Sequence, residues 1–306
     1  MELEMFTSYS REDWHALYQN DQLVQPMNEL EKLVSLNDRL SEEDVQKIYV
    51  PLVRYLDKIW QHIQQLNDMK QSFLSIEKRT VPFIIGVSGS VSVGKSTTAR
   101  VLRQLLAQAY PDKTVELMTT DGFLYATADL KKRGILNRKG FPESYDMPAL
   151  IDFMVRVKTS REPVSYPQYS HEIYDIIPDK KITVHQPDIL IVEGINVLQL
   201  PQNQRIYVSD FFDVSIYIDA EPVNIQQWYM ERFDMLLDLA RQDTNNYYYR
   251  MSQWPKQEAH AYAYNIWQTV NLVNLIQNIE PTRERANLIL HKTHNHLIDT
   301  IYVRNY

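Results

Sequence analysis

The chain of 306 residues contains no cysteine. That absence excludes disulfide bonds, zinc sites built from thiolates and cysteine nucleophiles. No stretch approaches the roughly 18 uninterrupted apolar residues of a membrane helix, and the N-terminus is acidic where a secretion signal would be apolar. We therefore expect a cytoplasmic protein with no membrane partner.

An excess of positive charge is also missing. Lysine and arginine together number 32 against 39 aspartates and glutamates, which gives a net charge of −7. This balance does not favour nucleic acid or an anionic membrane surface as a partner. The 44% hydrophobic and 23% charged content is typical of a globular protein with an ample core.

Glycine is scarce and unevenly placed. All 7 glycines lie between Gly86 and Gly194. Because glycine permits tight turns and a close approach of backbone to ligand, this distribution indicates that ligand-facing loops lie in the middle of the chain. Helical flanks that need no glycine would account for part of the same distribution.

A phosphate-binding loop is present at residues 89–96, which read GSVSVGKS. The segment follows an apolar run and precedes an expected helix, which is the context that this loop requires. Its glycines let backbone N–H groups turn toward a polyphosphate, and the helix N-terminus adds partial positive charge. The predicted nucleotide contacts are Gly89, Ser90, Val91, Ser92, Val93, Gly94, Lys95, Ser96 and Thr97. The alternative is a plain glycine turn between a strand and a helix.

Short apolar runs alternate with helical patterns in the central part of the chain. We expect strands at 81–88, 115–120, 188–192 and 214–219, with a helix at 96–109. This alternation predicts an α/β fold with a mostly parallel central sheet flanked by helices on both faces.

The two ends of the chain are predicted to be mainly helical additions. Residues 1–80 are expected to form a helical extension packed on the core, with a capping box at 41–44 and an interruption at Pro51. Residues 81–306 are expected to form the phosphate-loop domain, and the whole chain a single compact unit. Within that domain we expect helices from 221 and over 255–278, and closing strands at 288–291 and 298–303.

Two acidic residues follow expected strands. Glu193 ends an apolar strand and, with the Ser96 hydroxyl, is predicted to hold Mg²⁺. Asp121 follows the strand after the phosphate-loop helix, where a carboxylate can accept the proton of an attacking hydroxyl. Each could instead be a helix cap or a loop acid. The guanine-reading pattern Asn-Lys-x-Asp is absent, which favours ATP over GTP.

Several segments, in the same order along nearly the whole chain, resemble bacterial type I pantothenate kinase. These are residues 9–14, 89–100, 119–123, 139–146, 169–171, 186–196, 228–233 and 281–286. That family shares the P-loop kinase fold with uridine kinases and phosphoribulokinases. It transfers the γ-phosphate of ATP to the 4′-hydroxyl of pantothenate, the first step toward coenzyme A, and coenzyme A inhibits it at the ATP site.

The resemblance implies roles for individual residues. Asp121 is the expected general base, Lys95 holds ATP phosphates, and Arg232 neutralises charge in the transition state. The expected pantothenate contacts are Tyr169, His171, Tyr229 and Asn271. Arg100 and His171 match positions that contact coenzyme A, and the family relationship implies a homodimer. The lid region around Leu236 is less aromatic than in the family.

Other readings remain open on the residues alone. A uridine or phosphoribulose-type kinase would carry the same loop and acids. A nucleotide-binding regulator without turnover would keep the loop, although the presence of both Asp121 and Glu193 argues against it. Alone, Tyr229, His171 and Asn271 each have an ordinary structural explanation, as a core aromatic, a solvated histidine and a helix-surface amide.

Overall fold

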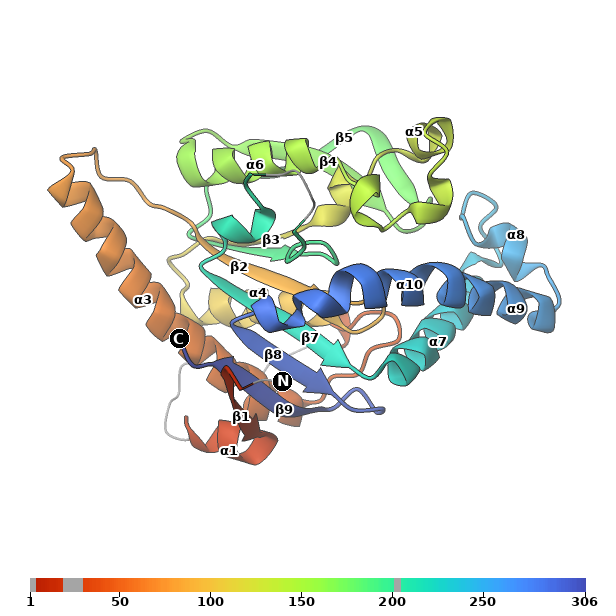
Figure 1. The fold of residues 1–306 in the computed structure, drawn as a ribbon, viewed down its shortest axis with the longest axis horizontal. Helices are drawn as coiled ribbons and strands as arrows, with labels where there is room; N and C mark the ends of the chain where they lie inside the picture. The colour runs from red at the N-terminus through yellow and green to blue at the C-terminus, as the bar shows by residue number, and fades with distance from the viewer. Residues whose placement is uncertain (1–3, 19–29, 201–204) are drawn as a thin grey trace.

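The computed structural model describes residues 4–18, 30–200 and 205–306. A seven-stranded sheet in the spatial order β1-β9-β8-β7-β2-β6-β3 forms its centre (Figure 1). The strands of this sheet are β1 Phe6–Ser10, β2 Phe83–Gly89, β3 Val115–Thr119, β6 Ile189–Glu193, β7 Val214–Ala220, β8 Leu288–Lys292 and β9 Ile298–Arg304. The five strands from β8 to β3 are parallel, β9 runs antiparallel to β8, and β1 runs antiparallel to β9. The predicted α/β class with a mostly parallel sheet is confirmed.

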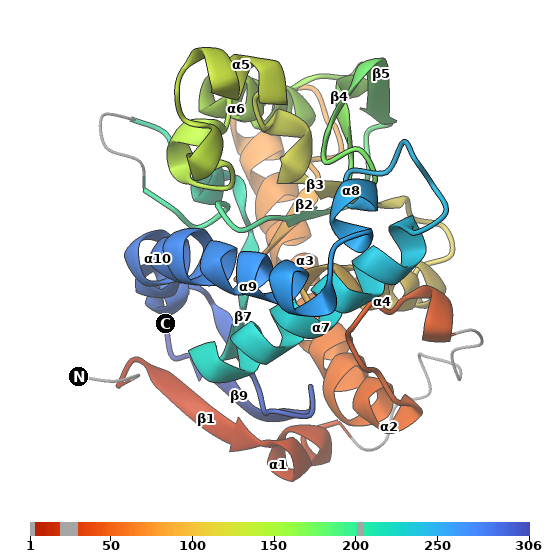
Figure 2. The same ribbon diagram turned by 90° about the vertical axis from the view of Figure 1, so that its right-hand side faces the viewer.

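Helices cover both faces of the sheet, as the alternating pattern predicts. On one face α4 contacts β2, β3 and β6, and α3 lies against α4. The helical segment that contains α9 and α10 crosses the opposite face, as the two perpendicular views in Figures 1 and 2 show. The main helices are α1 Arg11–Ala16, α2 Glu42–Asp44, α3 Val50–Phe73, α4 Lys95–Ala109, α5 Thr127–Lys132, α6 Met147–Thr159, α7 Pro222–Ala240, α8 Tyr249–Ser252, α9 Lys256–Ile266 and α10 Leu272–Asn274. Among the described residues, none of the helices combines the length and the apolar character that crossing a membrane requires.

The N-terminal segment differs from the prediction at one place. Residues 6–10, which were expected to be helical, form the edge strand β1, and each of them pairs with a residue of β9. The sequence of this strand shows no apolar alternation that would predict a strand. Only Phe6 is buried, and the other four side chains are partly or fully exposed. The helical prediction is therefore wrong for this strand. The division of the chain near residue 80 stays a prediction, and residues 1–3 and 19–29 of that extension lie outside the described residues.

The helical part of the N-terminal segment follows its sequence signals closely. Ser41 and Asp44 form the predicted capping box, with both reciprocal hydrogen bonds present. A π-helical turn over Val45–Tyr49 then precedes α3, and Pro51 is the second residue of α3. Proline has no N–H to continue the helical ladder, and the turn before it is π-helical, with the Val50 N–H bonded to the Val45 carbonyl oxygen. The expected interruption at Pro51 is thus a change of helix type.

A two-stranded hairpin, β4 Val164–Ser170 and β5 Asp175–Val184, had no counterpart in the prediction. Its central residues in β5 are exposed and charged, and each strand contains a proline, so neither apolar alternation nor β-propensity marks it. The helix predicted at 255–278 is α9 and α10 joined by π-helical turns, and it continues to Ile279.

Gly86 allows the backbone of β2 to lie close to the ring of Phe212. It lies in the fully buried strand β2, and a Cβ built on it would lie 2.3 Å from two ring carbons of Phe212. That distance is far inside van der Waals contact, so the ring and the strand would have to separate.

We expect Gly86→Ala to lower the free energy of unfolding by roughly 1–3 kcal/mol, because overpacking a rigid interior forces backbone or ring displacement. Urea unfolding followed by circular dichroism measures this change. The variant Gly86→Ala/Phe212→Leu, which removes the clashing ring, should recover part of the loss. An unchanged urea midpoint for the single variant would contradict the assignment of this contact.

Candidate active site

The phosphate loop joins β2 to α4 and turns on two glycines with positive φ. Gly89 has φ 144° and Gly94 has φ 100°. A Cβ on Gly89 would lie 2.6 Å from the Ile218 carbonyl oxygen of β7, so only glycine fits there. Gly94 is the N-cap of α4, whose first N–H groups have no partner within the helix. The loop therefore provides the backbone cradle and the helix N-terminus that phosphate groups require.

Lys95 is the first residue of α4. Its Nζ donates a hydrogen bond to the Ser90 carbonyl oxygen at 2.6 Å. Burial lowers the pKa of Lys95 to about 8, although the carboxylates of Glu193 and Asp121 oppose that shift. A polyphosphate would supply the negative charge that favours the ammonium form.

Ser96 and Glu193 form the part of the site suited to a magnesium ion. The Ser96 hydroxyl donates to Glu193 Oε2 at 2.8 Å. Glu193 ends β6 and pairs on either side with Val87 of β2 and Thr119 of β3, so it lies at the edge where the parallel strands end. Burial raises the pKa of Glu193.

A hydroxyl and a carboxylate are ligands that Mg²⁺ accepts. No group of three or more His, Cys, Asp or Glu side chains suited to a metal occurs within the described part of the chain. The Ser96 hydroxyl and the Glu193 carboxylate fit Mg²⁺, which normally completes its shell with phosphate oxygens and water. When bound, the ion would neutralise charge on the phosphates.

Asp121 lies in the 3-10 turn that follows β3, and its N–H donates to Thr119 Oγ1 at 3.3 Å. The neighbouring Gly122 has no room for a side chain, since a Cβ there would lie 2.3 Å from the Pro167 carbonyl oxygen of β4. This close approach brings the hairpin against the turn and places His171 Nε2 3.9 Å from Asp121 Oδ2. The side chain of His171 remains 62% exposed.

Tyrosine and amide side chains form the wall opposite the phosphate loop. Tyr229 of α7 lies 5.7 Å, between ring centroids, from buried Trp267, and its hydroxyl hydrogen bonds with Asn271. Burial raises the pKa of Tyr229, so the phenol stays neutral and can both donate and accept hydrogen bonds. Tyr169 of β4 packs edge-on against His171 with ring centroids 5.2 Å apart.

The two walls enclose one cavity of about 330 Å³. Most of the predicted site residues line it, namely Val91, Ser92, Gly94, Lys95, Ser96, Arg100, Asp121, Tyr169, His171, Glu193, Tyr229, Arg232 and Asn271. Gly89, Ser90, Val93 and Thr97 are not in the cavity wall, and the Thr97 side chain instead bonds to Ser35. The structure thus brings the predicted nucleotide and acceptor residues into one space. Their individual roles stay predictions.

Some lining residues had no clear signal in the sequence. Tyr174 and Tyr248 line the cavity, and the ring of Tyr174 stacks on Tyr247 at 4.7 Å between centroids. Lys139, which belongs to a basic run that could equally have been solvated, lies in the wall with its Nζ 4.3 Å from the Tyr174 ring centroid. Residues 35–38 reach the cavity from the N-terminal segment, and no local motif marks them.

Comparison with known proteins places the chain in a family. The model of the phosphoribulokinase/uridine kinase family matches residues 84–232. A pantothenate kinase of Latilactobacillus sakei is 53% identical over 97% of both chains, and one of Enterococcus faecalis is 52% identical over 97% of both. The chain belongs to the pantothenate kinase family. The D-glycerate 3-kinase of Cryptococcus neoformans, at 14% identity, has a similar fold with a TM-score of 0.54 over 81% of this chain and 97% of its own.

The lowered pKa of Lys95 generates a pH prediction. In the free protein this lysine loses its proton as the pH rises through about 8, and it then no longer attracts phosphate. Since kcat/KM reports ionisations of the free enzyme, we expect kcat/KM for ATP to fall above that pH.

Initial rates at limiting ATP between pH 6.5 and 9.5 measure this fall. The variant Lys95→Arg keeps its charge throughout this range, so its weaker activity should stay level above pH 8. A wild-type profile that is flat up to pH 9.5 would contradict the assignment.

Proposed function

We propose that this protein transfers the γ-phosphoryl group of ATP to the 4′-hydroxyl of pantothenate, giving 4′-phosphopantothenate and ADP. The observation that carries the proposal is a cavity of about 330 Å³ whose wall contains residues of the phosphate loop and Asp121 together with Tyr229 and Asn271. The relatives of about 50% identity named pantothenate kinase favour pantothenate over other alcohols as the acceptor.

In the proposed reaction the 4′-hydroxyl oxygen attacks the γ-phosphorus, and the bond to the bridging oxygen of ADP breaks. Asp121 accepts the hydroxyl proton, and the electron pair of the broken bond stays on ADP. Lys95 holds the ATP phosphates, and Arg232 on α7 neutralises charge on the transferring group. Asp121, Lys95 and Arg232 all lie in the cavity wall, which supports these roles.

The acceptor pocket is proposed to use neutral hydrogen-bonding groups. Pantothenate carries hydroxyls, an amide and a carboxylate, for which Tyr169, Tyr229 and Asn271 offer donors and acceptors. His171 lies next to Tyr169 and toward Asp121, where the reacting hydroxyl is expected.

Two finer expectations belong to the same proposal. Coenzyme A is proposed to compete with ATP, and the presence of Arg100 and His171 in the same wall supports it. The protein is also proposed to be a homodimer. At the exposed end of α3 the apolar side chains of Met69, Phe73 and Leu74 are 55%, 83% and 59% exposed, which offers a surface for a second copy.

An ADP-release assay with pantothenate, uridine or ribulose 5-phosphate as acceptor tests the proposed reaction. We expect turnover with pantothenate only, because the cavity wall supplies neutral donors suited to its amide and hydroxyls. Coenzyme A should raise the apparent KM for ATP in the same assay without lowering kcat. Turnover with uridine and none with pantothenate would replace the proposed acceptor.

We expect Asp121→Asn to lower kcat by about 10²-fold or more and to leave the Kd for ATP within about twofold, because an amide cannot accept the proton. Single-turnover rates and ATP titrations separate the two effects. Asp129→Asn removes an exposed carboxylate of α5 outside the cavity and serves as the matched control. An unchanged kcat for Asp121→Asn would assign the base elsewhere.

A further inference from the structure

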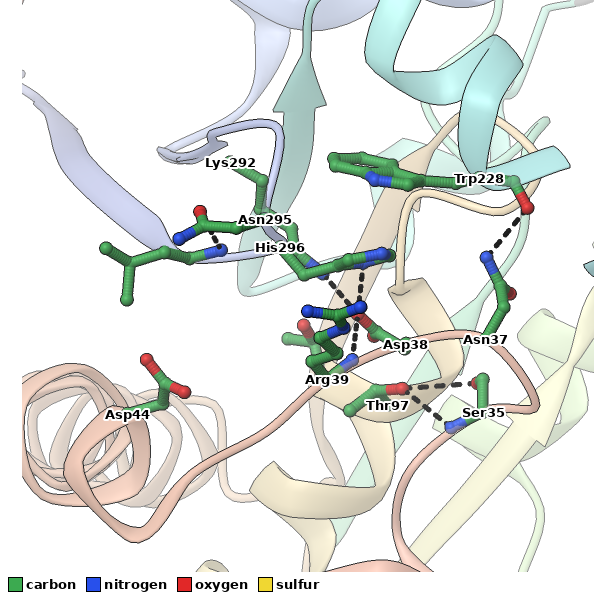
Figure 3. Close-up of polar contacts among 12 residues, drawn as sticks. Ser35, Asn37, Asp38, Arg39, Asp44, Thr97, Trp228, Lys292, Asn295 and His296 are labelled. Carbon is green, nitrogen blue, oxygen red and sulfur yellow. Dashed lines mark hydrogen bonds and ion pairs between the residues drawn. The ribbon is translucent and has the colours of Figure 1, made fainter. Parts of the chain in front are cut away.

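A buried ion pair lies directly beneath the phosphate loop. Lys292 at the end of β8 places Nζ 2.7 Å from Asp38 Oδ1, and their side chains are 5% and 3% exposed. His296 adds its Nδ1 at 2.9 Å from the same oxygen and is 3% exposed (Figure 3). Burial alone would raise the pKa of Asp38, but His296 and Lys292 hold that pKa at about 2. The carboxylate is therefore charged at every physiological pH.

The pair packs against the last glycine of the phosphate loop. A Cβ on Gly94 would lie 2.4 Å from Asp38 Oδ2 and 2.6 Å from Lys292 Nζ. Gly94 is the residue immediately before Lys95 and the N-cap of α4. Both charged groups thus touch the turn from which the nucleotide-binding lysine and the helix N-terminus follow.

The segment that carries Asp38 also binds the first turns of α4. The Ser35 N–H donates to Thr97 Oγ1 at 3.0 Å, and Arg100 donates to Ser35 Oγ and to the Leu33 carbonyl oxygen, both at 2.8 Å. Residues 33–38 therefore follow the start of α4 from Gly94 to Arg100. The Thr97 side chain, which lies outside the cavity wall, thus bonds to this segment.

The same segment reaches α7, which carries Tyr229 and Arg232. Asn37 Nδ2 donates to the Trp228 carbonyl oxygen at 2.8 Å, and the Trp228 ring stacks on His296 with 4.2 Å between centroids. Trp228 Nε1 in turn donates to the His294 carbonyl oxygen at 3.1 Å. Figure 3 shows these side chains converging from the N-terminal segment, α7 and the turn after β8.

We propose that Asp38, paired with Lys292, is a positioning residue that fixes the phosphate loop in its nucleotide-binding conformation. The pair carries no net charge, so it adds little long-range attraction for phosphate. It acts by holding two groups rigidly against the Gly94 turn. This inference rests on the proposed function only in that the phosphate loop binds ATP.

Replacing Asp38 and Lys292 together by uncharged residues separates an effect on the position of the phosphate loop from an effect on the stability of the protein. Replacing both partners of a buried ion pair by uncharged residues of similar size is often neutral for stability, whereas removing one partner leaves an unpaired charge. We expect Asp38→Asn to lower Tm and to raise the Kd for ATP about tenfold. Asp38→Asn/Lys292→Met should recover Tm and still raise the Kd for ATP at least fivefold, because no ion pair holds the turn. Asp38→Glu, which keeps the carboxylate, should bind ATP within about threefold of the wild type.

The binding measurement is a calorimetric titration with ATP and Mg²⁺ without pantothenate, well below the Tm of each variant. At saturating ATP the kcat of the double variant should fall less than threefold, since asparagine can still bond to His296 and Asn37 still reaches α7. The matched control is Lys158→Met/Asp213→Asn. This control neutralises a second ion pair, in which Lys158 Nζ lies 2.7 Å from Asp213 Oδ2 and the side chains are 18% and 17% exposed. Asp213 also accepts a hydrogen bond from the Ile84 N–H, near the start of β2 and away from the site.

We expect this control to bind ATP within twofold of the wild type. Wild-type affinity in Asp38→Asn/Lys292→Met, or an equal loss of affinity in the control, would overturn the positioning role and leave the proposed reaction intact. Absence of ATP binding by the wild type itself would overturn both. If Asp38→Asn alone does not fold, the double variant and Asp38→Glu still decide the question.

Discussion

The site depends on how closely β2 can approach β7 at the point where both strands end. At Gly89 the two backbones are so near that a single methyl group would meet the Ile218 carbonyl oxygen at 2.6 Å. From there the chain leaves the sheet in a tight loop and starts α4 at Lys95. Every other group of the site is arranged around that helix start. Glu193 reaches Ser96 because β6 is the parallel neighbour of β2, and Asp121 reaches the same edge because β3 is the next.

The donor and acceptor halves of the cavity are stabilised by different physical means. The phosphate half consists of the glycine turns of the phosphate loop and a few charged side chains. Burial changes how readily these side chains ionise, as the lowered pKa of Lys95 shows. The acceptor half is made of aromatic packing. Tyr229 packs against Trp267, and Tyr169 packs edge-on against His171. A charged phosphate half and an aromatic acceptor half together suit a reaction in which a polyanion meets an alcohol.

The sequence was sufficient for the parts of the fold whose residues act locally. The phosphate loop, the strands β2, β3 and β6 and the capping box at Ser41 each depend on contiguous residues, and each is where the sequence predicts it. The strand β1 and the β4–β5 hairpin escaped prediction because their stability comes from partners and not from their own apolar pattern. Residues 35–38 escaped for the same reason, since the importance of Asp38 is defined by Lys292, 254 positions away.

The pairing of β1 with β9 has a consequence for the order of assembly. Phe6 pairs with Arg304 and Ser10 with Thr300, so the first of the described strands to be synthesised needs the last one as its partner. The same holds for Asp38, whose partner Lys292 ends β8. During translation the phosphate loop is therefore complete in sequence long before its supports exist. Loop closure over such separations is slow compared with local helix formation. The pairing of β1 and the ion pair of Asp38 can therefore form only after the C-terminal strands have been synthesised, whereas the contacts of Leu33 and Ser35 with α4 need no residue beyond Arg100.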